Sequence, residues 1–419
     1  MDLMAEIDRQ AADVADRPQD TGARLDLALL RNRAGQVDQA SDDCAAVLAL
    51  VPGHPGALWL SARLALDRGE AAAARASLDE VLARKDLSMT QRAETLLLAA
   101  EVHDALAAPA ESFAAAAAGK GWQRTAFAAT AAAHESETAR YRRLAAWFGR
   151  LHDAPAPHAV PSGHVFLLGF PRSGTTLLEQ VLAGHPGVSA TEEAPTLTAH
   201  QRAYLADDAG CVRLGRLTAA ETGQARAAYW QAVRVAGGTP PGERGTQVYL
   251  DKAPAGTLWM PLIARLFPGA RVLFAVRDPR DVVLSCLRTP FMMNAMTYEF
   301  TDLSAAAACY DACMAMAEVY RRVLPLAVMD VGHEDFVADP AAGLSAIGDF
   351  IGIDVDPGML DVAATAAQRR VQTPSGRQLR QGLNARGVGR WRAFAGEMAP
   401  VMPILAPWVA RFGYGDEHG

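Results

Sequence analysis

Hydrophobic and polar positions follow one pattern in the first part of the chain and a different one after it. The first part is rich in Ala, Leu, Arg and Asp and contains almost no runs of β-branched residues, which is typical of helices throughout. In the later part, short apolar runs resemble buried strands and alternate with helical segments, at residues 165–168, 248–250 and 271–276. Alternating strands and helices predict a parallel α/β sheet.

The two patterns divide the chain into two domains. Residues 1–151 are predicted to form an all-α domain, and residues 163–419 an α/β domain. Between them, residues 152–162 contain three prolines and no periodicity, which indicates a linker. A chain of 419 residues is long enough for two or three domains of about 150 residues each.

The all-α domain repeats itself with a helix-turn-helix period of 34 residues. The residue pairs that keep this offset are Gly35 and Gly69, Ala40 and Ala74, and Leu30 and Leu64. A third copy is expected at residues 106–113, displaced by an insertion at 85–91, and residues 140–151 predict a further helix that closes the array. This period resembles the tetratricopeptide repeat (TPR), so the domain is expected to be TPR-like. An Ala-rich bundle with a coincidental period is the alternative.

Composition and charge argue against several classes of protein. The 40 basic and 47 acidic residues give a net charge of −7, which argues against a nucleic-acid partner bound through a general basic field. No stretch approaches the ~18 unbroken apolar residues of a membrane span, and the acidic N-terminus lacks the apolar region of a secretory signal. The five cysteines are too few and too scattered for a disulfide framework. We therefore expect a cytoplasmic protein without a membrane partner.

A phosphate-binding loop is indicated where the first predicted strand ends. The spacing Gly169-x4-Gly174 is followed by Thr175 and Thr176 and by a helix expected over about 175–183, so that backbone N–H groups and the positive helix end would face an anion. The spacing has the outline of G-x4-G-K-[ST], but Thr175 occupies the lysine position and Arg172 lies inside the loop. A nucleoside triphosphatase is therefore disfavoured, and a 5′-phosphate group with another leaving chemistry is favoured. A turn without a ligand is the alternative.

Two blocks carry a resemblance to a known family. The stretch PRSGTT, which begins at Pro171 and follows an apolar strand, resembles the 5′-phosphosulfate loop of sulfotransferases that use 3′-phosphoadenosine-5′-phosphosulfate (PAPS). About 100 residues later, residues 272–285 resemble the 3′-phosphate element of that family, and the resemblance places the 3′-phosphate contacts on Arg277 and Ser285. The planar fork of arginine suits a phosphate because it donates two parallel charge-assisted bonds. The resemblance implies a P-loop-like parallel-sheet sulfotransferase domain.

Three further segments narrow the resemblance to tyrosylprotein sulfotransferases. Residues 189–195 resemble the GEE segment of those enzymes, and residues 250–254 resemble their NKDP segment. Residues 375–391 align without gaps to the segment that ends in a basic residue and Trp. The resemblance covers residues from about 163 to 395, and the tandem of helical repeats and sulfotransferase domain looks like a bacterial type.

The family match implies a role for each matching residue. Glu193 is expected to be the general base, and Arg172, Lys252 and Ser375 to stabilise charge in the transition state. The expected cofactor-binding residues are Arg172, Ser173, Gly174, Thr175, Thr176, Arg277, Ser285, Asn384 and Arg390. No metal is expected, because PAPS lacks the triphosphate that makes Mg²⁺ necessary in kinases.

The roles of Glu193 and Lys252 each have an alternative without a function. Glu192 and Glu193 are alternatively a solvated pair in a loop. Lys252 is alternatively a surface lysine, although it is one of only three lysines among 40 basic residues, with Lys85 and Lys120. A compact ammonium fits at a bridging oxygen where a guanidinium would be too bulky.

The chain departs from the tyrosylprotein pattern at two places. His333 replaces a tyrosine that contacts the cofactor, so that contact is in doubt. The additional arginine of the family corresponds to Thr289, with Arg288 one position away. These changes spare the chemistry but weaken any assignment of the acceptor.

Three other groups of residues are expected to be structural. Cys309 and Cys313 lack a histidine pattern that would complete a zinc site and are expected to be buried small hydrophobes. His185 is expected to be a structural residue at a helix end. For Met292, Met293 and Met296, core filling is favoured over an acceptor cleft.

The expected reaction is sulfuryl transfer from PAPS to an acceptor hydroxyl, with 3′-phosphoadenosine-5′-phosphate (PAP) as product. A repeat array offers a groove for peptides, which favours a protein tyrosine, while a small molecule or glycan is the alternative acceptor. The array is equally compatible with a homodimer. Two rival functions are a P-loop kinase, which would need the missing lysine and a magnesium carboxylate, and a repeat scaffold with an inactive nucleotide-binding domain.

Overall fold

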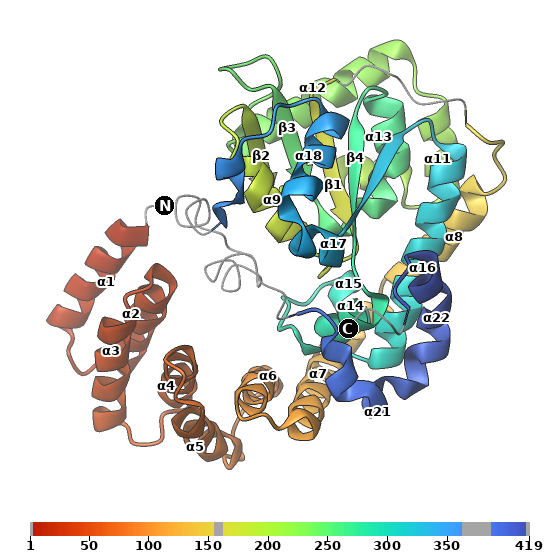
Figure 1. Ribbon diagram of the computed structural model, residues 1–419. Helices are drawn as coiled ribbons and strands as arrows, with labels where there is room; N and C mark the ends of the chain where they lie inside the picture. Colours follow the sequence, from red (N-terminus) through yellow and green to blue (C-terminus); the bar gives the residue numbers. More distant parts are fainter. Residues whose placement is uncertain (1–2, 155–161, 363–386, 416–419) are drawn as a thin grey trace. The chain divides into compact units, whose positions relative to one another are not determined.

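The computed structural model describes residues 3–154, 162–362 and 387–415 (Figure 1). The chain forms two compact units. The first contains Met1–Ala132 and Leu287–Met293, and the second contains Ala133–Cys286 and Asn294–Gly419. Most of the predicted linker, and with it residues 155–161, lies outside the described residues, as do Ser375 and Asn384.

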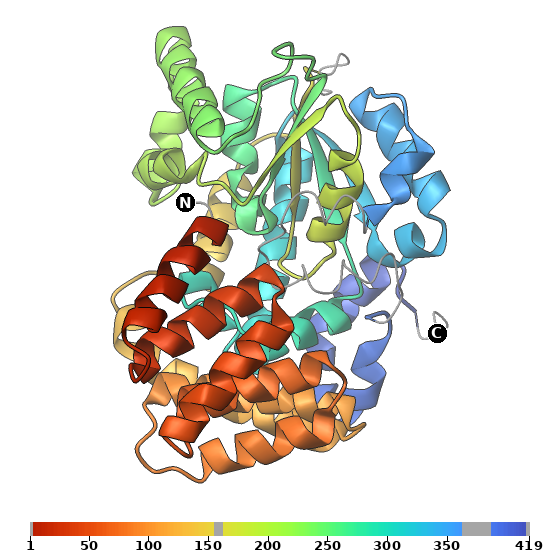
Figure 2. The ribbon, with the colours of Figure 1, turned by 90° about the vertical axis from the view of Figure 1, so that its left-hand side faces the viewer.

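Helices in antiparallel pairs build the first unit, as the residue pattern predicts (Figure 2). The turns between α2 and α3 and between α4 and α5 contain Gly35 and Gly69, which have φ of +79° and +82° and so adopt the left-handed conformation that glycine allows. Ala40 and Ala74 occupy the same place after each turn and are fully buried. The helices are α1 (Leu3–Asp16), α2 (Thr21–Ala34), α3 (Val37–Leu50), α4 (Pro55–Asp67), α5 (Ala71–Leu82), α6 (Met89–Ala105) and α7 (Pro109–Ala132).

A segment from the later part of the chain, Leu287–Met293, belongs to this first unit. Lys120 of α7 is fully buried and donates a hydrogen bond to the carbonyl of Thr289 at 2.7 Å. Arg288 forms an ion pair with Asp104 and donates to Ser112 at 3.0 Å. The predicted boundaries therefore differ from the observed units, because tertiary contacts draw this segment to the repeat helices.

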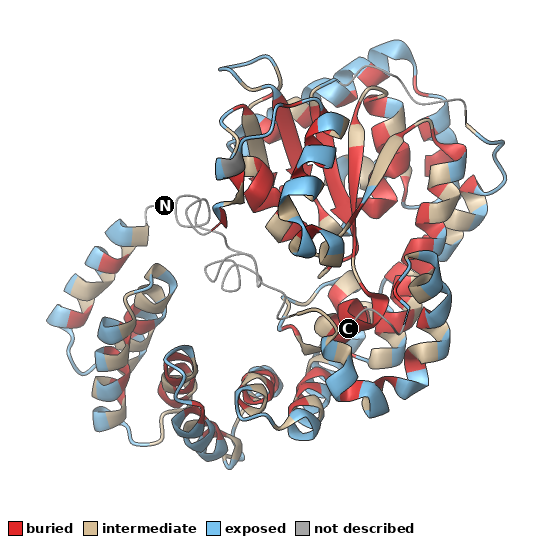
Figure 3. Cartoon of the chain, in the orientation of Figure 1, coloured by how far each residue is buried: buried red, intermediate tan, exposed pale blue. Residues whose placement is uncertain are grey.

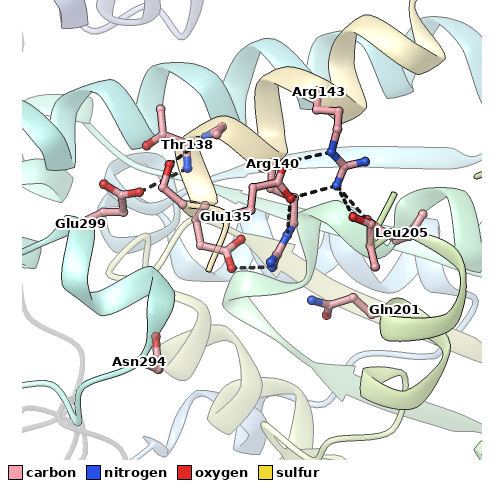
Figure 4. A network of polar contacts seen from close by, with 12 residues as sticks. Glu135, Thr138, Arg140, Arg143, Gln201, Leu205, Asn294 and Glu299 are labelled. Atoms are coloured by element: carbon pink, nitrogen blue, oxygen red, sulfur yellow. Dashed lines mark hydrogen bonds and ion pairs between the residues drawn. The ribbon is translucent and has the colours of Figure 1, made fainter. Parts of the chain in front are cut away.

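The helix that was expected to close the array belongs to the second unit. It is α8 (Glu137–Phe148), and it packs against α16 (Leu303–Val323) through buried side chains such as Tyr141 and Phe148. Polar contacts hold it in place (Figure 4): Arg143 donates to Glu135 at 2.9 Å and to the carbonyl of Leu205 at 3.2 Å. The compact units thus divide after residue 132 rather than 151.

The second unit is built on a five-stranded parallel sheet with the order β2-β3-β1-β4-β5. The three predicted strands are present, which confirms the α/β prediction, and two strands that the pattern did not reveal lie at the sheet edges. Figure 3 shows that the central strands are buried. The strands are β1 (His164–Gly169), β2 (Val188–Glu192), β3 (Val248–Lys252), β4 (Arg271–Val276) and β5 (Ala327–Gly332).

Helices cover both faces of this sheet. On one face, apolar residues of β1, β3 and β4 pack against α9 (Thr175–Ala183) and α18 (Pro340–Ile351). On the other face, His164 and Phe166 contact Tyr229 of α12 (Ala219–Val235), and Arg321 of α16 lies over Phe274. The remaining elements are α10 (Thr198–Tyr204), α11 (Asp208–Gly215), η1 (Pro254–Trp259), α13 (Met260–Leu266), α14 (Pro279–Arg288), α15 (Ala295–Glu299), α17 (His333–Ala338) and η2 (Pro357–Leu360).

The C-terminal stretch Arg390–Arg411 is, within the described ranges, the one helical stretch long and apolar enough to cross a membrane by length and composition alone. The sequence pattern did not reveal it, because no unbroken apolar run marks it. It is divided into η3 (Arg390–Phe394), α21 (Ala395–Met398), η4 (Ala399–Val401) and α22 (Met402–Arg411). Pro407 lies inside α22, which packs against α16, and Trp408 donates to Asp311 at 2.9 Å. In this structure the stretch is therefore a broken helical segment held on α16.

Candidate functional site

The loop between β1 and α9 has the geometry that the sequence predicts for an anion site. α9 begins at Thr175 and ends at Ala183, as expected. Gly174 precedes it with φ of +92° and has no side chain to cap the helix, so the N–H groups of Thr175 and Thr176 would face a ligand, whereas the N–H of Leu177 donates to the carbonyl of Gly174 at 3.1 Å. Arg172 has φ of +74°, an uncommon conformation for a residue with a side chain. Ser173, Thr175 and Thr176 are buried.

His333 lies directly against this loop. A Cβ atom on residue 174 would come within 2.7 Å of Nδ1 of His333, so the loop requires glycine there. Burial, together with the positive charge of Arg277, lowers the pKa of His333 to about 3. The position at which the sequence departs from the tyrosylprotein pattern therefore presents a neutral imidazole to the loop.

The structure brings Arg172, Arg277 and Ser285 together. Arg277, which follows β4, donates through Nη1 to the carbonyl of Arg172 at 3.2 Å. Nε of Arg172 donates to Oγ of Ser285 on α14 at 3.0 Å. Burial lowers the pKa of Arg172, and the charge of Arg277 acts in the same direction. Two guanidinium groups thus converge on the end of the phosphate loop.

These residues fit a phosphate ligand. In the part of the chain that the structure describes, Nε of Arg277 is buried and has no hydrogen-bond partner. A buried donor without a partner is costly, and two neighbouring guanidinium groups repel each other. A phosphate placed between Arg172 and Arg277 would relieve both costs.

The segment 387–391 lies against the predicted 3′-phosphate element. Asp281 of α14 accepts hydrogen bonds from the N–H groups of Gly389 at 2.7 Å and Trp391 at 2.8 Å. Burial raises the pKa of Asp281 to about 6, despite the nearby charge of Arg277. The guanidinium of Arg280 lies 4.1 Å from the centre of the Trp391 ring. Arg390, predicted to bind the cofactor, is exposed within this segment, while Ser375 and Asn384 fall outside the described residues.

Lys252 is the centre of a cluster of carboxylates at the end of β3. Its side chain is 0% exposed, so the interpretation as a surface lysine is wrong. Its Nζ lies 2.9 Å from Glu193, 3.3 Å from Glu179 and 3.8 Å from Glu192. Burial alone would lower the pKa of Lys252, but the three carboxylates outweigh burial and raise it. Lys252 is therefore a buried ammonium ion.

The register of two strands places Glu193 beside Lys252. Glu192, the last residue of β2, is opposite Lys252 in the parallel pairing, and the N–H of Glu193 donates to the carbonyl of Lys252 at 3.1 Å. Glu193 has φ of +49°, and its side chain is 51% exposed. The two glutamates are therefore anchored at a strand end and are not a freely solvated pair. Glu193 is paired with an ammonium ion and is still accessible to an acceptor.

Two buried acids near this cluster were missed in the sequence. Glu179 lies four residues after Thr175 in α9, and this spacing, which puts both residues on one helix face, is the signal that could have revealed it. Asp251 precedes Lys252 and accepts hydrogen bonds from Tyr229 at 2.7 Å and Thr196 at 2.8 Å. Burial raises the pKa of Asp251 to about 6. Alternation along β3 directs the side chains of Asp251 and Lys252 to opposite faces.

The remaining candidates behave as structural residues, with one exception. Cys309 and Cys313 are buried, as expected, and within the described ranges no group of His, Cys, Asp and Glu side chains could hold a metal ion. His185 accepts a hydrogen bond from the N–H of Gly187 at 3.0 Å, consistent with the structural role expected of it. Met292 is 90% exposed, so the expectation of core filling is wrong for this residue, which lies in a loop rather than in a packed helix.

Comparisons with known proteins show what this chain is similar to. Residues 164–357 match the sulfotransferase family. Protein-tyrosine sulfotransferase 2 of Gallus gallus is 27% identical over 272 residues, which cover 60% of this chain and 69% of that protein. An uncharacterized protein of Aquifex aeolicus is 26% identical over 264 residues. The match covers 61% of this chain but only 33% of that relative's length. The sulfotransferase domain of the Synechococcus PCC 7002 olefin synthase is 25% identical, with 57% of this chain and 91% of that domain covered and a TM-score of 0.39.

Proposed function

Because residues 164–357 form a sulfotransferase domain homologous to protein-tyrosine sulfotransferases, we propose that this protein transfers a sulfuryl group from PAPS to an acceptor hydroxyl. The observation that carries the proposal is the convergence of Arg172, Arg277 and Ser285 at the phosphate loop. A kinase would need a loop lysine, and Thr175 stands in that position.

The donor would be held by residues of the loop and of α14. The N–H groups of Gly174, Thr175 and Thr176, with Arg172, would bind the 5′-phosphosulfate, whereas the N–H of Ser173 already donates to the carbonyl of Phe170 at 3.2 Å. Arg277 and Ser285 would bind the 3′-phosphate. The buried Nε of Arg277 supports this assignment, because a phosphate oxygen would supply the acceptor that it needs. When bound, PAPS supplies an activated sulfuryl group joined to a phosphate through a bridging oxygen.

Glu193 and Lys252 would divide the chemistry between them. Glu193 would accept the proton of the acceptor hydroxyl as the acceptor oxygen takes the sulfuryl group and the bridging oxygen leaves with its electron pair. Lys252 offsets the negative charge that the bridging oxygen then carries with the departing electron pair. Ser375 would assist the same charge by hydrogen bonding, as its family match implies.

A tyrosine hydroxyl is the acceptor that we propose to test first. Two of the similar proteins are protein-tyrosine sulfotransferases. The half-exposed Glu193 would also be reachable by a peptide side chain. The hydroxyl of a small molecule or a glycan is the second candidate, since the same base and the same ammonium ion would serve it.

Calorimetric titration with PAP, and separately with ATP and Mg²⁺, tests the proposed donor. We expect PAP to bind and ATP to bind far more weakly. Arg277→Ala should weaken PAP binding roughly 10- to 100-fold, because hydrogen bonds to charged groups contribute about 1.5–3 kcal/mol. Arg234→Ala, which removes an exposed arginine of α12 paired with Glu243, should leave PAP binding unchanged. Preference for ATP would contradict the sulfotransferase assignment and favour a kinase.

Transfer of [35S]sulfate from labelled PAPS to a tyrosine-containing peptide, a phenol and an oligosaccharide tests turnover. Labelled peptide supports a tyrosine acceptor, and labelled phenol or oligosaccharide supports the second candidate. PAP binding without transfer to any of them would favour the inactive scaffold.

A further inference from the structure

Glu179 is a buried acid on α9, the helix that follows the phosphate loop. Its side chain is 1% exposed, and its carboxylate lies 3.3 Å from Nζ of Lys252, which is itself fully buried. Thr175 and Glu179 lie one turn apart on the same face of α9. One helix therefore carries both the phosphate loop at its start and an anion for Lys252 one turn later.

The other two carboxylates around Lys252 differ from Glu179 in a way that matters for the reaction. Glu193 is nearest at 2.9 Å, but it is half-exposed and is the proposed base. Glu192 is partly exposed and lies 3.8 Å away, at the limit of an ion pair. Glu179 is thus the close partner that solvent does not reach and that the proposed chemistry does not alter.

Proton transfer changes the charge around Lys252 at the critical moment. When Glu193 accepts the acceptor's proton it becomes neutral, so Lys252 loses the charge of its nearest partner. Burial favours the neutral form of an amine, and a neutral Lys252 could not offset charge on the bridging oxygen. A second, permanent carboxylate beside Nζ keeps the ammonium charged throughout the transfer.

We propose that Glu179 is a positioning residue for sulfuryl transfer, which keeps Lys252 charged and fixed at the end of β3 when Glu193 is protonated. The inference rests on the proposed function. Because α9 connects Glu179 to the phosphate loop, the same contact would also fix the ammonium ion relative to the loop.

Lysine-selective NMR tests the charge coupling without donor or acceptor. The whole chain contains three lysines, so labelling with [13C]lysine gives three sets of 13Cε signals, and Lys252→Arg identifies one of them. We expect Lys252 to stay charged beyond the ordinary lysine range. In Glu179→Gln its titration midpoint should fall by about one to three pH units. The signals of Lys85 and Lys120, which lie in the other unit, should not move.

Two matched variants make the result specific. Glu192→Gln removes the more distant and more exposed carboxylate and should shift the midpoint by less than half as much. Glu179→Asp keeps the charge and should retain most of the raised midpoint, and it serves in place of Glu179→Gln should that variant fail to fold. An unchanged midpoint in Glu179→Gln, or a larger shift in Glu192→Gln, would overturn the inference.

The pH dependence of turnover then separates this inference from the proposed function. Glu179→Gln should lower kcat about tenfold, change the KM for PAPS little, and move the loss of activity at high pH to lower pH, in step with the NMR midpoint. A moved midpoint with an unmoved pH profile would overturn the positioning role while the sulfotransferase assignment stands. Absence of PAP binding by the unaltered protein would instead contradict the proposed function.

Discussion

The two units of this protein each bury one lysine completely but surround it differently. Lys120 in the repeat unit donates to the carbonyl of Thr289 and lies 5.5 Å from the centre of the Phe291 ring. Lys252 in the α/β unit is surrounded by the carboxylates of Glu179, Glu192 and Glu193. A carbonyl and a ring suit an ammonium ion that joins two segments, whereas a cluster of carboxylates keeps a buried ammonium ion charged, as the proposed reaction requires. Burial of a rare lysine therefore does not identify a function until its partners are known.

Lys252→Met is expected to have the largest effect, and it tests whether Lys252 serves the reaction. We expect the rate of sulfuryl transfer to fall by about 10²–10³, the range seen when a group that stabilises transition-state charge is removed. PAP binding should persist, because Arg172, Arg277 and Ser285 remain. Lys85→Met, at an exposed position of the repeat unit, is the matched control and should be fully active. Transfer at the normal rate by Lys252→Met would contradict the role of Lys252.

Asp251, the neighbour of Lys252 in β3, is expected to make the stability of the protein depend on pH. The folded-state pKa of Asp251 is raised to about 6, so the proton on its carboxyl favours the folded state. The contribution of Asp251 to stability is therefore fully present below about pH 4 and is lost as pH rises through about 6. The loss amounts to about 3 kcal/mol at pH 8.

Asp251→Asn removes this titration and keeps an oxygen for Tyr229 and Thr196. Urea unfolding at pH 4.5 and pH 8 should show that the substitution becomes more favourable at the higher pH, by about 2 kcal/mol. Asp281, whose pKa is also raised to about 6, titrates in both proteins and cancels from the difference. A difference that does not change with pH would show that Asp251 is ionised throughout.

Lys120→Met tests the structural half of the comparison. Removal of the ammonium leaves the buried carbonyl of Thr289 without this donor, which should lower the free energy of unfolding by about 2 kcal/mol. Sulfuryl transfer per folded molecule should not change. A loss of transfer in the folded variant would mean that both buried lysines serve the reaction.

Ser285→Ala has the smallest expected effect. It removes the hydrogen bond that Arg172 donates and one proposed phosphate ligand, so PAP should bind about fivefold to tenfold more weakly. Calorimetry against Ser304→Ala, a serine in α16 outside the site, gives the reference. Equal affinities in the two variants would remove Ser285 from the proposed site.

The parts of the fold that could be predicted are those determined by local pattern. β1 and β4 are unbroken apolar runs in the middle of the sheet, and α9 follows directly from a loop motif. β2 and β5 lie at the edges and contain Thr, Glu and Asp, so their sequences do not read as buried strands. The place of α8 was missed because its pattern matches that of the repeat helices, and only its contacts with α16 assign it to the second unit.

In the candidate site, too, the residues that belong to sequence motifs could be predicted, whereas their tertiary partners could not. Arg172, Arg277 and Ser285 belong to two motifs, and the structure brings them together as the resemblance implies. The partners of Lys252 could not be foreseen in full, because they depend on the register of β2 against β3 and on which face of α9 is turned inward. The sequence motif identified Lys252, and only the tertiary structure shows which carboxylates surround it.

The most direct test of the central claim is a crystal structure of the full chain with PAP bound. We expect the 5′-phosphate on the N–H groups of Gly174, Thr175 and Thr176 and the 3′-phosphate between Arg277 and Ser285. Lys252 and Glu193 should lie beside the 5′-phosphate, on the side where the sulfuryl group would be attached. A nucleotide bound elsewhere, or with its 3′-phosphate away from Arg277, would contradict the account.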